Sequence, residues 1–175
     1  YAYVSDYARL WVLYNYGGIY FDTDVEVIKP LDDILSMGSF MGIEKCTRGN
    51  VDGAQVNIGL GFASQKGDKI LKEIMDFYET HHYIYPDGHV EQIPIVPITT
   101  DVLVRHGFDR KNRLQKIGDF TIYPWDFFCP IEFLSSKLDI TLNTRTIHHY
   151  TATWMSWTDK LKMKKGSFFD RNFIG

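Results

Sequence analysis

Two aspartates at the end of an apolar run, Asp22 and Asp24, are the residues whose types and spacing most directly suggest chemistry. The run over residues 19–25 is rich in β-branched and aromatic side chains and lies between a Gly-Gly pair and a proline, which predicts a buried strand. Side chains at i and i+2 share one face of a strand, so the two carboxylates are expected about 7 Å apart on one side. Burying two acids together is costly unless positive charge meets them. The pattern therefore predicts a divalent cation that carries a phosphorylated ligand, the alternative being two solvated acids at a strand end.

The segment before this strand is predicted to be a helix that begins at Ser5. Ser5 can cap a helix, and Asp6 in the first turn suits the positive end of the helix dipole. Asp6 and Arg9 are one helical turn apart and so share a face. The glycine pair supplies the stop, and the strand with the two acids follows. This order would bring an acid, a fixed cation and a two-acid metal site to one ligand, unless Asp6 and Arg9 form only a surface ion pair.

The composition is that of an ordinary globular protein. The chain has 175 residues, 45% of them hydrophobic and 23% charged, which predicts one domain, residues 1–175, with its own core. A net charge of −3 argues against a nucleic-acid partner. No apolar run approaches the ~20 residues of a transmembrane helix. The two cysteines, Cys46 and Cys129, make no disulfide framework, so a cytoplasmic location is expected.

The combined pattern S-D-x-x-R followed by G-G-x-Y-x-D-x-D, over residues 5–24, resembles the sugar-binding DXD region of glycosyltransferase family 32. That family includes bacterial capsular-polysaccharide transferases and fungal initiating α-1,6-mannosyltransferases. The pattern is also similar to the catalytic domains of the large clostridial glucosylating toxins. The resemblance implies a GT-A-like, Rossmann-like α/β fold with a mixed sheet flanked by helices. It further implies that a hexose moves, with retention of configuration, from a UDP- or GDP-sugar to a glycan or lipid-linked acceptor, as in polysaccharide biosynthesis.

The same resemblance implies a role for each site residue. Asp24, and Asp22 directly or through water, would hold Mn²⁺ or Mg²⁺, which stabilises the diphosphate leaving group. Asp6 and Arg9 would bind the sugar hydroxyls and, with Asp22, form the catalytic set. Asn57, on a glycine-bearing strand expected over residues 56–63, would line the donor-sugar pocket, the alternative being a structural asparagine at a strand edge.

A late histidine pair provides the third metal ligand that we expect. Residues 146–150 are predicted to be a strand, and they resemble the family's terminal His-His-aromatic-x-x-Ser-Trp segment. Neighbouring strand residues face opposite ways, so one histidine lines the site. An imidazole nitrogen suits Mn²⁺-type ions beside carboxylates, and we expect the histidine that lines the site to be His149 rather than His148; a hydrogen-bonded core histidine is the alternative.

The C-terminal segment is expected to contact the sugar donor and a membrane surface. Trp154 would close over the donor. Residues 154–165 mix tryptophan and methionine with lysines, which suits peripheral contact with the inner face of an anionic membrane or, alternatively, an ordinary solvated helix. Nucleotide-binding α/β folds usually open with a strand, whereas this chain enters a helix almost at once. We therefore expect a nucleotide-binding segment to precede Tyr1.

Two other classes of protein fit part of the pattern. A haloacid-dehalogenase-like phosphatase also has an apolar strand that ends in D-x-D, with Asp22 as nucleophile and Asp24 as general acid. Its later metal-binding acids would be Asp119 and Asp126. The other class is a sugar-nucleotide-binding module without turnover. The phosphatase reading leaves the S-D-x-x-R segment and the glycine turn unexplained.

Overall fold

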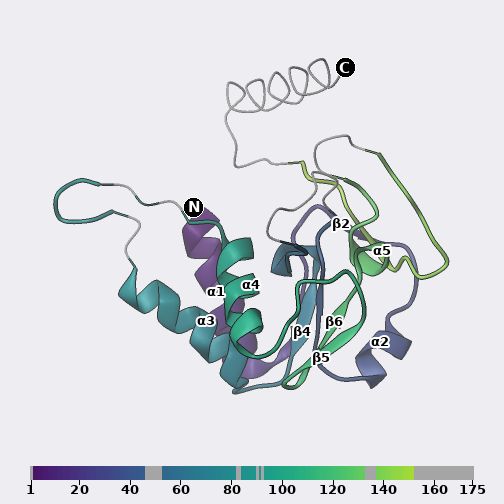
Figure 1. The fold of residues 1–175 in the computed structure, drawn as a ribbon, viewed down its shortest axis with the longest axis horizontal. Coiled ribbons are helices and arrows are strands. Elements are labelled where there is room, and N and C mark those ends of the chain that lie inside the picture. The colour runs from purple at the N-terminus through teal and green to yellow at the C-terminus, as the bar shows by residue number, and fades with distance from the viewer. Residues whose placement is uncertain are drawn as a thin grey trace, which may run out of the picture.

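A computed structural model of the chain describes residues 2–45, 53–81, 84–89, 91, 93–132 and 137–151. Over these residues the fold is mixed α/β, with helices on both faces of a five-stranded sheet (Figure 1). The sheet has the order β1-β4-β3-β6-β5 and is itself mixed, because β3 and β6 are parallel while the other neighbours are antiparallel. Its strands are β1 (Gly18–Tyr20), β3 (Phe40–Gly42), β4 (Phe62–Ser64), β5 (Gln115–Ile117) and β6 (Phe120–Tyr123).

Three helices cover one face of this sheet: α1 (Ala2–Tyr16), α3 (Lys69–Thr80) and α4 (Ile95–Arg105). The Asp68 side chain caps α3 by accepting from the N–H groups of Ile70 and Leu71 at 2.8 and 3.1 Å.

The opposite face carries two short helices, α2 (Asp32–Ser36) and α5 (Trp125–Phe128). Successive residues of β3 serve the two layers, because Phe40 packs with the α2–α5 side and Met41 with the α1–α3–α4 side. Both side chains are fully buried. A strand buried on both faces explains why this part of the sequence is continuously apolar rather than alternating.

A second, two-stranded sheet pairs β2 (Val25–Val27) with β7 (Thr146–His148) in antiparallel register, so that Val25 lies opposite His148. This pairing brings the C-terminal histidines to the segment that carries the two aspartates. The expected strand over residues 146–150 is confirmed for its first three residues.

The single strand expected over residues 19–25 is wrong. Strand β1 ends at Tyr20 and pairs with β4, whereas β2 begins at Val25 and pairs with β7. Asp22 and Asp24 lie in the turn between them, where the Asp22 N–H donates to the Gly59 carbonyl at 3.3 Å. The chain changes partner sheet at this point, so one continuous strand cannot form.

Two further boundaries differ from expectation. Helix α1 already includes Ala2, so Ser5 lies inside it rather than at its cap. The strand expected over residues 56–63 is interrupted by a 3₁₀ turn, η1 (Ile58–Leu60), before β4 begins. None of the helices in the described ranges has the length and apolar character needed to span a membrane.

Candidate active site

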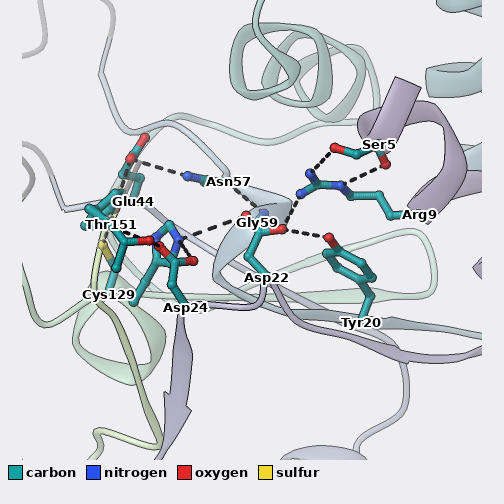
Figure 2. A network of polar contacts seen from close by, with 12 residues as sticks. Ser5, Arg9, Tyr20, Asp22, Asp24, Glu44, Asn57, Gly59, Cys129 and Thr151 are labelled. Carbon is teal, nitrogen blue, oxygen red and sulfur yellow. Dashed lines mark hydrogen bonds and ion pairs between the residues drawn. The ribbon is translucent and has the colours of Figure 1, made fainter. Parts of the chain in front are cut away.

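Arg9 connects helix α1 to the aspartate turn. Its side chain is 8% exposed, and its guanidinium forms ion pairs with Asp6 at 2.9 Å and with Asp22 at 2.8 Å. Its Nε also donates to the Ser5 carbonyl at 3.3 Å (Figure 2). The expected sharing of one helix face by Asp6 and Arg9 is confirmed, and their ion pair is partly buried rather than a solvated surface contact.

Tyr20 is a site residue that the sequence reasoning did not select. Its hydroxyl donates to Asp22 Oδ1 at 2.7 Å, and its ring lies 4.8 Å from the Arg9 guanidinium (Figure 2). Burial, together with the hydrogen bond to Asp22, raises the pKa of Tyr20 to about 12 although Arg9 opposes the shift. The hydroxyl therefore remains a donor at neutral pH. The tyrosine of G-G-x-Y-x-D-x-D was the signal that could have identified it.

Asp6 is a partly buried carboxylate that lies beside other charged groups. Its side chain is 14% exposed. Burial raises the pKa of Asp6 to about 6, with Arg9 lowering it and the charge of Asp22 raising it further. An acid kept ionised in such a place at neutral pH is a strong hydrogen-bond acceptor for a polar ligand.

Three groups converge in the turn and on β7: Asp22, Asp24 and His148 offer ligand atoms that all lie within 4.8 Å of one another. His148 Nε2 is 3.0 Å from Asp24 Oδ1 and 4.0 Å from Asp22 Oδ2. The other oxygen of each acid is occupied, since Asp22 Oδ1 accepts from Arg9 and Tyr20 and Asp24 Oδ2 accepts from Thr151. Protein donors thus hold one side of each carboxylate and leave the other side turned toward the histidine.

Thr151 fixes Asp24. Its N–H and its hydroxyl donate to Asp24 Oδ2 at 2.8 and 2.9 Å (Figure 2). Burial alone would raise the pKa of Asp24, but these two hydrogen bonds and the charge of His148 outweigh it, so the pKa lies below its usual value. Asp24 is therefore an anion over the physiological pH range. In the sequence, the only sign of this role is that Thr151 directly follows the His148-His149-Tyr150 segment.

Asn57 and Gly59 support Asp22 from η1. Asn57 Oδ1 accepts from the Gly59 N–H at 2.7 Å, which caps the 3₁₀ turn. A Cβ atom at position 59 would lie 2.5 Å from Asp22 Oδ2. The Asp22 side chain therefore lies directly against Gly59, and Asn57 caps the 3₁₀ turn, while its expected part in donor binding stays a prediction.

His149 does not lie with the two aspartates. Its Nε2 is 2.9 Å from Glu26, and its side chain is 44% exposed. Because Val25 pairs with His148, that residue faces the acids and its neighbour points away. The structure therefore places His148, and not the expected His149, beside the two aspartates. Trp154 and the segment 154–165 lie outside the described residues.

The two later acids that the phosphatase alternative uses, Asp119 and Asp126, lie in other parts of the fold. Asp119 lies in the turn between β5 and β6, and Asp126 accepts from the side chains of Thr141 and Asn143. Within the described residues the only group of three or more potential ligands is Asp22, Asp24 and His148. The acids that this alternative requires are therefore not assembled around Asp22.

The donor set of this cluster fits a divalent cation. Carboxylate oxygens suit Mg²⁺ and Mn²⁺, and an imidazole nitrogen beside them favours a Mn²⁺-type ion over Mg²⁺. The buried guanidinium of Arg9 alongside supplies a fixed positive charge with donors in a planar fork. A cation site next to an arginine–aspartate pair can bind a phosphorylated ligand and a polyhydroxyl group together.

Comparisons with known proteins agree with this chemistry. Residues 1–41 match the family described as "Glycosyltransferase sugar-binding region containing DXD motif". The chain is also 47% identical over 36 residues to inositol phosphoceramide mannosyltransferase 1 of Schizosaccharomyces pombe; the match covers 21% of this chain and 11% of that protein. No solved structure matches the chain significantly.

Both matches support a glycosyltransferase family. The family match covers α1, β1, the aspartate turn, β2 and α2 and extends into β3. The mixed sheet flanked by helices is compatible with the GT-A-like fold expected from the motif.

Proposed function

We propose that this protein is a metal-dependent, retaining glycosyltransferase that moves a hexose from a UDP- or GDP-sugar to a glycan or lipid-linked acceptor. The observation that carries the proposal is the joint use of Asp22. One oxygen of Asp22 binds the buried Arg9, and the other faces His148 beside Asp24. This arrangement gives the proposed sugar-binding pair and the proposed cation-binding set a common member, which would place the donor sugar beside the ion that binds its diphosphate.

Asp22, Asp24 and His148 would hold the ion in this proposal. The ion would stabilise the negative charge that develops on the diphosphate as the sugar leaves. Arg9 and Asp6 would bind hydroxyls of the donor sugar, the first as a donor and the second as an acceptor. Since Arg9 is already held by Asp6, Asp22 and Ser5, little side-chain freedom would be lost on binding.

Retention of configuration and the role of Asp22 in catalysis rest on the family resemblance. The donor and acceptor are proposed more narrowly from the relative in yeast, whose name specifies a mannosyl group and an inositol phosphoceramide. Mannose is therefore the first donor sugar to test, and a phosphoinositol-bearing lipid is the first acceptor. A cytoplasmic location with contact between residues 154–165 and the inner face of a membrane remains part of the proposal, and vesicle co-sedimentation would test that contact.

The experiment is a titration with a panel of UDP- and GDP-sugars, with and without Mn²⁺, that follows thermal stability and nucleotide release. Metal-dependent stabilisation by one donor, with release of its nucleotide, would support the transferase and identify the sugar. Release of phosphate from simple monoesters, with no response to any sugar nucleotide, would favour the phosphatase. Donor binding with no release in any acceptor mixture would favour a binding module without turnover.

A further inference from the structure

One oxygen of Glu44 holds two segments that are far apart in the sequence. Glu44 Oε1 accepts from the Asn57 side-chain amide at 3.3 Å and from the Tyr150 hydroxyl at 2.9 Å. Glu44 and Tyr150 are 106 positions apart. Glu44 follows β3, Asn57 begins η1 and Tyr150 follows β7, so a single acceptor ties three parts of the fold together. Glu44 is not one of the three potential ligand groups, Asp22, Asp24 and His148.

The first of these bonds leads to Asp22. Asn57 can hold the Gly59 N–H with Oδ1 only while its amide is kept in one orientation, and Glu44 accepts from the Nδ2 end of that amide. Gly59 in turn accepts from the Asp22 N–H and allows Asp22 Oδ2 to approach closely. Figure 2 shows Glu44, Asn57, Gly59 and Asp22 in this sequence of contacts.

The second bond leads to His148 and Asp24. Tyr150 adopts a positive φ of 51°, a conformation that is uncommon for residues other than glycine. Its ring centroid lies 4.1 Å from that of His148, and its hydroxyl also lies 3.0 Å from Cys129 Sγ. The next residue, Thr151, donates twice to Asp24. The unusual backbone of Tyr150 thus directs Thr151 toward Asp24 while its ring packs against the histidine.

We propose that Glu44 is a positioning residue that sets the distance between the Asp22 side and the Asp24–His148 side of the cluster. It acts through Asn57 on Asp22 and through Tyr150 on the other two groups. The significance for catalysis rests on the proposed function, but the positioning itself is a property of the protein without ligands. This allows a test that does not depend on activity.

The geometry supplies a matched pair of variants. Both donors use Oε1, so Glu44→Gln keeps a carbonyl acceptor in the same place and preserves both bonds. Glu44→Leu has a similar volume and removes both. In the metal-free full-length protein, hydrogen–deuterium exchange is measured on peptides that contain Gly59 and Thr151, with a peptide from α3 as the control for global stability.

The proposal predicts that Glu44→Leu accelerates exchange about fivefold at both Gly59 and Thr151 relative to α3, while Glu44→Gln stays near wild type. Equal protection of either segment in Glu44→Leu and wild type would overturn it. Uniform acceleration that includes α3 would also overturn it, because Glu44 would then act on the whole fold.

Titration with Mn²⁺ alone, followed by calorimetry, extends the test to the ligand groups. Disturbing the partners of metal ligands typically costs about 10- to 100-fold in affinity, and Glu44→Leu should lose that much while Glu44→Gln binds as wild type does. Normal affinity in Glu44→Leu would contradict the positioning role. Failure of the wild-type protein to bind Mn²⁺ would instead count against the proposed function, and the exchange experiment would still decide the role of Glu44.

Discussion

Arg9 Nη1 lies 2.8 Å from Asp22 Oδ1 and so joins a helix to the turn that carries the aspartate pair. The same guanidinium holds Asp6, which is one turn earlier in α1. One buried cation therefore sets the position of two acids that belong to different elements. The ion pair between Arg9 and Asp22 therefore connects the proposed sugar-binding residues with the proposed metal-binding residues.

Arg9→Lys should lower the rate of sugar transfer about 100-fold. A lysine carries the charge but cannot reach Asp6 and Asp22 together with the planar fork of arginine, and small misplacements of binding groups have effects of this size. The control is Arg105→Lys, which alters an exposed arginine paired with Glu73 on the surface. Steady-state kinetics should show wild-type activity for the control. Equal activity of the two variants would show that the Arg9 bridge has no part in the reaction.

Gly59→Ala should impair Mn²⁺ binding more than it impairs folding. The added Cβ would meet Asp22 Oδ2 at 2.5 Å, so this carboxylate has to move. Gly118→Ala is the control, because its Cβ would meet Ile70 Cδ1 of α3 at 3.1 Å and its φ of 55° disfavours alanine, so the substitution strains the turn between β5 and β6 instead.

Calorimetric titration and thermal melting separate the two effects. The control should lower the melting temperature and keep the metal affinity, whereas Gly59→Ala should lose at least about tenfold in affinity. The same affinity in both variants would argue against the placement of Asp22.

The two histidines should respond differently to removal. His148→Ala takes away the imidazole that lies 3.0 Å from Asp24, whereas His149→Ala removes an exposed contact with Glu26. Mn²⁺ affinity should fall at least about tenfold in the first variant and remain within about twofold of wild type in the second. A larger loss of Mn²⁺ affinity in His149→Ala than in His148→Ala would support His149 as the ligand and would contradict the observed register of β2 and β7.

Asp6 should lower the stability of the metal-free protein at neutral pH. Its pKa is raised from 3.8 to about 6 in the folded state, chiefly by burial. A folded state that binds the proton more tightly is destabilised by ionisation, so the penalty is present above about pH 6 and is relieved as the pH falls toward about 4.

Urea unfolding of wild type and Asp6→Asn in the presence of a chelator would measure this penalty. The free energy of unfolding of wild type, minus that of the variant, should decrease by about 2–3 kcal/mol as the pH rises through this window. A difference that is constant or increases with pH would contradict the burial of an ionised Asp6. The same variant should lose activity, because the proposed acceptor for sugar hydroxyls is neutralised.

Local features of the site were accessible from the sequence, and long-range ones were not. Asp6 and Arg9 meet because residues one turn apart on a helix always lie near each other, and no tertiary information is needed. The glycine pair also predicted the end of α1 correctly, and Gly17 has the positive φ of 68° that such a stop requires.

The orientation of the histidines depends on pairing between strands over a hundred positions apart. Strand alternation says that one of His148 and His149 faces the acids, but only the register of Val25 with His148 says which. The contacts of Glu44 are unpredictable for the same reason, because no sequence feature near Glu44 indicates that it meets Asn57 and Tyr150 in the fold. The turn at Asp22 was missed because an apolar run that passes from one sheet to another has the same composition as one continuous strand.

The most direct measurement of the central claim is Mn²⁺-dependent release of nucleotide from a sugar donor by wild type and by Asp24→Asn. Asp24 contacts both His148 and Thr151, and its exchange for the neutral isostere preserves shape while it removes the charge. If Asp24 holds a catalytic cation, the variant should be folded with wild-type secondary structure, bind Mn²⁺ at least about tenfold more weakly and release nucleotide about 100-fold or more slowly. Near-normal metal-dependent release by the folded Asp24→Asn variant would contradict this role of Asp24.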